Sequence, residues 1–178
     1  MKPPKILKPY VLSFCHQISK HAPVFIPSRP LFGKPPNECF AIIPEHIALH
    51  GGKQYIGWSI WEWPKVFIEA EFHCIWKSPE GELIDLTPKR YTFDRILFLP
   101  NPGKQYKGIQ VDNIRKPLSN NRDIDRFLLL AKQKFPLLNE GDSAYQKKVP
   151  VDQRFLKAEK EMAYLQLKLI GKYGSPYP

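Results

Sequence analysis

The stretch VFIEAEFHCIWKSPEGELIDLTP, residues 66–88, contains two segments of β-strand character joined by a short turn. Residues 66–76 are rich in aromatic and β-branched side chains, and Ser-Pro-Glu-Gly at 78–81 places glycine where a tight turn needs it. We therefore expect an antiparallel hairpin. If its paired residue numbers sum to about 158 or 160, His73 lies opposite residues 85–87, and antiparallel neighbours stand about 5 Å apart.

The preceding and following segments extend this hairpin into a sheet. Residues 53–62 alternate apolar and small or polar side chains, as a strand does, and residues 95–99 form a further short apolar run. Together with the hairpin they predict a four-stranded antiparallel meander. Trp58 and Trp61 fall on opposite faces of their strand, so in a one-sided sheet only one of them belongs to the core and the other lines a cleft.

Helical patterns flank the predicted sheet. Apolar side chains recur at helical spacing within residues 9–20, 122–138 and 152–172, and the last two segments have basic outer faces. A further apolar helix begins near Cys39, with Asn37 as its expected N-cap, and Pro44 predicts a kink in it. The fold class is therefore α+β, with one helix packed on the sheet, an N-terminal helix and C-terminal helices.

Length and proline content set the domain organisation. A chain of 178 residues is long enough for a single core, and we expect that core over residues 1–110 and a helical extension over 111–178. Many of the 19 prolines occur between residues 23 and 36, which predicts an extended lead-in without regular structure.

Charge is concentrated in the second half of the chain. Residues 1–88 hold 9 Lys and Arg against 8 Asp and Glu, whereas residues 89–178 hold 18 against 9, which accounts for almost all of the net charge of +10. A basic half can dock an acidic protein or nucleic acid, and it can also simply maintain solubility.

The cysteine count and the first residues bear on the compartment. Three cysteines are too few for a disulfide framework and have no metal-ligand spacing, so we expect free thiols. No apolar run is long enough for a signal peptide or a membrane helix. We expect a soluble protein without membrane insertion, either cytoplasmic or exported without a cleavable signal peptide.

Cys39, His73 and Asp85 could act together in chemistry. A thiol acts as a nucleophile in its thiolate form, with an imidazole to exchange its proton, and a helix N-terminus favours the anion. Cys39 is placed at such a helix start, where its backbone N–H is oriented to bind an oxyanion. His73 and Asp85 lie on adjacent strands of the hairpin, where a carboxylate can orient an imidazole.

This pattern resembles the papain-like cysteine hydrolase superfamily in its transglutaminase-like arrangement. The matching pieces are Asn-Glu-Cys-Phe at 37–40 and the segment His-Cys-Ile-Trp through Asp-Leu-Thr-Pro at 73–88, and the resemblance covers about 60 of the 178 residues. The resemblance implies a hydrolase of amides or peptides, a deamidase or an acyltransferase, acting on a protein or peptide substrate with no metal and no cofactor. Cys39 would be the nucleophile, His73 the general base and then acid, and Asp85 the residue that orients the imidazole.

Further candidates surround this triad. Asn37 and Gln54 have the chemistry to donate a hydrogen bond to an oxyanion, while Trp58, Trp61 and Glu71 are candidates for substrate binding. Each triad residue also has a purely structural interpretation: a buried thiol, a hydrogen-bonded core histidine and a turn aspartate.

Other functions remain open at this stage. Alternate residues Glu69, Glu71 and His73 project from one strand face and, with His46 and His50, could bind a divalent metal, although a glutamate row facing basic residues is the simpler interpretation. A non-catalytic binding module of the same fold could use the basic half to hold its partner. A toxin or effector enzyme delivered into another cell is a third possibility.

Overall fold

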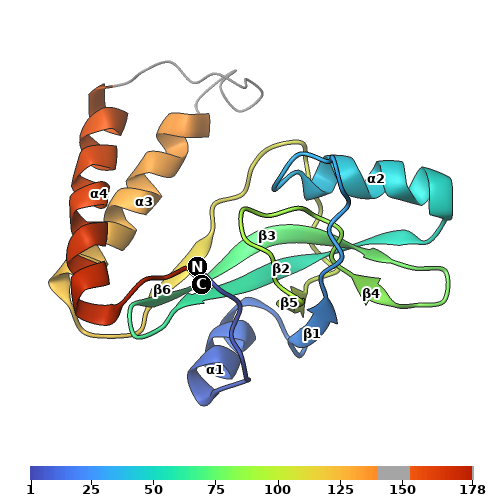
Figure 1. The fold of residues 1–178 in the computed structure, drawn as a ribbon, viewed down its shortest axis with the longest axis horizontal. Coiled ribbons are helices and arrows are strands. Elements are labelled where there is room, and N and C mark those ends of the chain that lie inside the picture. The colour runs from blue at the N-terminus through green and yellow to red at the C-terminus, as the bar shows by residue number, and fades with distance from the viewer. Residues whose placement is uncertain (140–152, 178) are drawn as a thin grey trace.

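Two long strands form the centre of the fold. β2 (Lys53–Trp63) and β3 (Phe67–Lys77) pair antiparallel along their whole length. In this computed structural model, which describes residues 1–139 and 153–177, the pair crosses the middle of an α+β fold (Figure 1). The expected hairpin continues from β3 into β4 (Leu83–Ile84) through a turn in which the Gly81 N–H donates to the Ser78 carbonyl. Trp76 pairs with Ile84 and Lys77 with Leu83, so the register sum is 160, one of the two expected values.

The sheet is larger than predicted and is not a simple meander. Among the described residues it has six strands, because β1 (Val24–Pro27) and β6 (Ile114–Pro117) join the four that were expected. In a meander β5 (Arg95–Pro100) would pair with β4, but it pairs with β2 and β1 instead. The order of strands in the sheet is therefore β1-β5-β2-β3-β4, with β6 on β3. Proline is tolerated at the edge of a sheet, which is why the proline-rich lead-in still contains a strand.

The lead-in after β1 runs beside the chain that follows β4. Ser28 forms a parallel bridge with Asp85, and the Arg29 N–H donates to the Asp85 carbonyl. Further along, the Leu31 N–H donates to the carbonyl of Leu86, and that of Asn37 to the carbonyl of Pro88. These contacts join the two ends of the sheet and make it barrel-like. They also deliver the chain directly to the start of α2 (Cys39–His50).

Both faces of the central strands are covered, which corrects the expectation for the tryptophans. Trp58 packs under α1 (Pro9–Ile18) and is 3% exposed, whereas Trp61 lies on the opposite face with Ile75 and Phe98 and is 6% exposed. The prediction assumed a one-sided sheet. Because the sheet curls on itself, the second face is also an interior, and both indoles belong to the core.

The basic C-terminal segment contributes to the sheet before it becomes helical. β6 pairs with the first half of β3, and α3 (Arg122–Asn139) and α4 (Gln153–Tyr173) then lie side by side beyond the β2–β3 turn (Figure 1). Ile124 and Leu169 pack against Trp63 and Phe67, which joins the helices to the sheet. The two predicted helices are therefore present, and Asp152, the expected first residue of the second, lies outside the described residues. Within the described ranges, no helix is long and apolar enough to cross a membrane.

Candidate thiol active site

An interruption in the outer edge of β3 creates the site. On the side away from β2, β6 pairs with residues 67–70 and β4 with residues 76–77. Residues 71–75 therefore lack a partner strand on that edge, and the start of α2 occupies the position. The Cys74 N–H, which a neighbouring strand would otherwise bind, points to the Cys39 Sγ at 3.5 Å.

Cys39 is the first residue of α2, and it is 4% exposed. The residue before it, Glu38, is the N-cap, and no side chain caps the helix, so the expected role of Asn37 is corrected. Asn37 instead has a left-handed backbone with φ of 63° and donates its N–H to Pro88. Because the first N–H groups of a helix have no intrahelical acceptor, the Cys39 amide is available as a hydrogen-bond donor. Pro44 stays inside α2.

The imidazole of His73 is bound by a buried carboxylate. His73 Nε2 lies 2.9 Å from Asp85 Oδ1, with the His73 side chain 5% exposed and that of Asp85 fully buried. Asp85 is held in place independently: its Oδ1 accepts from the Thr87 N–H at 3.2 Å, and its Oδ2 accepts from Lys89 Nζ at 2.5 Å. With Nε2 engaged, Nδ1 is the ring nitrogen left for the Cys39 thiol.

The pKa values of the three groups shift in directions that favour an ion pair. A hydrogen bond from the Cys74 thiol lowers the pKa of Cys39; burial opposes this change, the positive charge of His73 reinforces it, and the value falls to about 4. Burial alone would lower the pKa of His73, but the charges of Asp85 and the Cys39 thiolate raise it to about 9. Although burial favours the neutral acid, His73 and then Lys89 hold the pKa of Asp85 well below its ordinary value of 3.8.

Together these shifts favour one protonation state of the site around neutral pH: a Cys39 thiolate beside a His73 imidazolium, with Asp85 ionised behind it. A thiolate is a nucleophile, and an imidazolium can donate a proton to a leaving group. The neighbouring thiol differs, because its contact with the Cys39 thiolate, together with burial, raises the pKa of Cys74 and keeps it neutral.

A pocket of about 240 Å³ includes Cys39 in its lining. It is formed by the start of α2, the free edge of β3 and the segment before β6, and it is lined by Asn37, Glu38, Cys39, Phe40, Glu71, Phe72, Tyr106, Gln110, Val111 and Asn113. The candidates Asn37 and Glu71 therefore line the same pocket as Cys39. The contributions of Phe40 and Tyr106 were missed by sequence reasoning, because no pattern links residue 106 to the helix start.

The other candidates lie behind the pocket. The Gln54 side chain does not line the pocket; it hydrogen-bonds Cys74, whose pKa it lowers, so it contacts the site indirectly. Trp58 does not line the pocket; its ring packs on Phe72 at 5.2 Å between centroids. Trp61 Nε1 donates to Glu71 Oε2 at 2.8 Å and so orients one residue of the lining.

The residues of the alternative metal site are engaged elsewhere. Glu69 is bonded to Arg115 of β6 at 3.0 Å, which is the glutamate–basic pairing that we considered simpler. Glu71 binds Trp61 and His73 binds Asp85, while His46 and His50 stack on each other in α2. Among the described residues, no group of three or more potential ligands is arranged to hold a metal ion.

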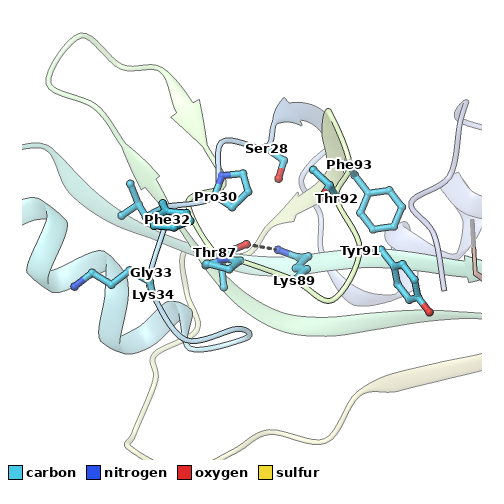
Figure 2. A pocket seen from close by; sticks show the side chains of 12 residues that line it. Ser28, Pro30, Phe32, Gly33, Lys34, Thr87, Lys89, Tyr91, Thr92 and Phe93 are labelled. Carbon is cyan, nitrogen blue, oxygen red and sulfur yellow. Dashed lines mark hydrogen bonds between the residues drawn. The ribbon is translucent and has the colours of Figure 1, made fainter.

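Lys89 is a site residue that the sequence analysis overlooked. The available signal was its position four residues after Asp85, because the two side chains form an ion pair over that short separation. Figure 2 shows Lys89 with its bond to the Thr87 carbonyl oxygen, among the residues of a second pocket of about 290 Å³. The cation thus separates Asp85 from this second pocket.

Comparison with known proteins gives no guide to this arrangement. No protein-family model, curated protein or solved structure matches the chain. The interpretation of the site therefore depends on its own geometry.

Proposed function

We propose that this protein is a thiol-dependent hydrolase of amides or peptides, with Cys39 as nucleophile, His73 as general base and acid, and Asp85 as the residue that orients the imidazole. The observation that supports it most is the 2.9 Å contact between His73 Nε2 and Asp85, beside a thiol at a helix N-terminus. A structural histidine would need neither a fully buried carboxylate nor a neighbouring thiolate.

The proposed reaction has two stages. In the first, the Cys39 thiolate attacks the substrate carbonyl carbon and forms a carbon–sulfur bond, while the His73 imidazolium gives its proton to the departing amine as the carbon–nitrogen bond breaks. In the second, water loses a proton to His73 and attacks the thioester, which releases the carboxylic acid and restores the thiolate. An amine in place of water would make the same site an acyltransferase, and a primary amide substrate would make it a deamidase.

Charge develops on the carbonyl oxygen during both attacks. The Cys39 backbone N–H, at the first position of α2, is one donor for this oxyanion, and the Asn37 side chain in the pocket lining is the candidate for a second. Gln54 lies against Cys74 and does not line the pocket, so we assign it to support of the thiol pair.

The test is the pH dependence of Cys39 alkylation by iodoacetamide, measured by mass spectrometry beside Cys15 and Cys74. We expect Cys39 to react well below pH 8, because its pKa is lowered, and this low-pH reactivity to vanish in His73→Ala. Cys15 is the internal control, since burial raises its pKa to about 12. If Cys39 is alkylated with the pH profile of an ordinary thiol, and His73→Ala leaves that profile unchanged, the proposal is wrong.

The second candidate is a non-catalytic binding module of the same fold, and it is favoured by the 18 Lys and Arg of residues 89–178. Binding to an acidic protein or a nucleic acid through this half would weaken steeply between low and moderate salt. On α3 and α4, however, three basic residues are already paired with acidic ones: Arg126 with Glu161, Lys134 with Glu159, and Lys168 with Asp123. This internal pairing makes the charge of the helices a weaker argument than the composition alone.

A further inference from the structure

The pocket at Cys39 has a local charge opposite to that of the protein. Its lining includes two carboxylates, Glu38 and Glu71, and contains no lysine, arginine or histidine. The charge of the Cys39 thiolate is balanced by the His73 imidazolium, so the two glutamates set the net charge of the pocket. On a chain of net charge +10, such a pocket is a local exception, and it attracts cations at short range.

One of these carboxylates is held in position. Glu71 lies at the free edge of β3, two residues before His73, and Trp61 Nε1 fixes its Oε2 at 2.8 Å. This bond restricts the Glu71 side chain before any ligand binds, so less side-chain freedom is lost on binding. Glu38 is exposed at the mouth, directly before the nucleophile.

The apolar part of the pocket suits the stem of a long cationic side chain. Phe40 stacks on Tyr106 with ring centroids 3.9 Å apart and on Phe72 at 5.3 Å. Aromatic faces attract ammonium and guanidinium groups and pack against methylene chains. The pocket therefore combines an aromatic wall with carboxylates, which is the chemistry that recognises lysine or arginine.

From this combination we infer that the substrate carries an ammonium or guanidinium group close to the reacting carbonyl, as a peptide with lysine or arginine next to the scissile amide does. The inference rests on the proposed function, because it assigns a substrate class to the same thiol. It specifies in addition that Glu71 and Glu38 select for positive charge.

The test uses three methanethiosulfonate reagents on the full chain at pH 7, with modification of Cys39 followed by mass spectrometry. In each, the thiolate attacks the sulfenyl sulfur, a disulfide forms and methanesulfinate leaves. The ethyltrimethylammonium reagent is cationic, the ethylsulfonate reagent is anionic, and the methyl reagent is neutral. Each rate is divided by the rate of the same reagent with N-acetylcysteine amide, so that only the effect of the pocket remains.

We expect the normalised cation-to-anion ratio to be about tenfold or more at low salt and to fall toward one at 0.5 M salt. Glu71→Gln and Glu38→Gln should each lower the ratio severalfold. Glu80→Gln, an exposed carboxylate in the β3–β4 turn, is the matched control and should leave it unchanged. Because Glu38 is exposed, its variant tests the inference even if loss of the Trp61 bond destabilises the Glu71 variant.

The outcomes separate the two levels of the argument. The substrate inference is wrong if Cys39 reacts rapidly with the neutral reagent but the normalised ratio is near one. It is also wrong if Glu80→Gln changes the ratio as much as Glu71→Gln does. Neither result contradicts the proposed thiol-dependent hydrolase. If Cys39 is slow with the neutral reagent as well, the activated thiol is absent and both proposals are overturned.

Discussion

Replacing Asp85 by asparagine removes one charge from the centre of the site while keeping the shape of the side chain. The carboxylate is fully buried and pairs with two cations at once, the His73 imidazolium and Lys89, whose side chains are 5% and 10% exposed. Asparagine can still accept the hydrogen bond from the Thr87 N–H. What it cannot do is balance the two positive charges left behind.

The size of the effect follows from this burial. Removing one partner of a buried ion pair costs about 3–5 kcal/mol, and the retained Thr87 bond places Asp85→Asn at the lower end, about 3 kcal/mol. For a chain of this length, that loss lowers the melting temperature by about 6 to 12 °C. The folded pKa of Asp85 is depressed, so its contribution to stability is present above its ordinary value of 3.8 and is lost as the pH falls further. The free energies of unfolding of parent and variant should therefore differ by the whole of this amount at pH 7 and by less at pH 3.

The assay is urea unfolding followed by tryptophan fluorescence at pH 7 and pH 3. Asp94→Asn is the control. Because Asp94 is exposed, this variant should lose no more than about 0.5 kcal/mol of the free energy of unfolding. A loss below about 1 kcal/mol for Asp85→Asn at pH 7, or a difference that does not change with pH, would refute the view that Asp85 is an ionised carboxylate holding two cations.

Three further predictions concern the thiol and the strand beneath it. The free energy of unfolding of the parent should rise between about pH 4 and 6.5. In this range the unfolded chain has both Cys39 and His73 protonated, whereas the folded chain holds the Cys39 thiolate and so binds one proton fewer. Cys39→Ser should lose this rise in urea unfolding. Cys74→Ala should raise the pKa of Cys39, because it removes the largest cause of the lowered value, and the alkylation profile should move to higher pH. An unmoved midpoint would assign the shift to His73 and to the Cys74 backbone N–H, which the variant keeps. Gly57→Ala should destabilise the protein by about 1–3 kcal/mol, since its added carbon would lie 2.3 Å from the Leu99 carbonyl oxygen; a melting temperature within 1 °C of the parent would show that β5 can move away.

The hairpin around His73 could be predicted because its determinants are local. Alternating apolar residues define β3, and glycine at position 81 closes the turn, so the register had two reasonable values and the structure has one of them. Side-chain alternation along β3 likewise accounts for Cys74, which neighbours His73 in the strand and is fully buried in a core. These features depend on residues within about twenty positions of one another.

The rest of the site depends on contacts between distant segments. The position of Cys39 is set by the lead-in, which is hydrogen-bonded along residues 85–88. The prolines of the lead-in predicted irregular structure, so β1 was not predicted. The free edge of β3 exists only because β6 and β4 stop short of residues 71–75, and nothing in the local sequence of β3 records where its neighbours end. The placement of Trp58 and Trp61 was wrong for the same reason, since curling of the sheet is a property of the whole chain.

The bridge between Ser28 and Asp85 has a consequence for folding. It joins segments far apart in the sequence, and contacts of that kind form late, because the chain must lose the entropy of a long loop before they are made. Asp85 and Cys39 both reach their positions through this closure, one at the bridge and the other at the end of the lead-in that it anchors. If the proposed function is right, a chain in which this closure has not formed carries an ordinary thiol. Alkylation of Cys39 during refolding would then report when the segments of Ser28 and Asp85 pair.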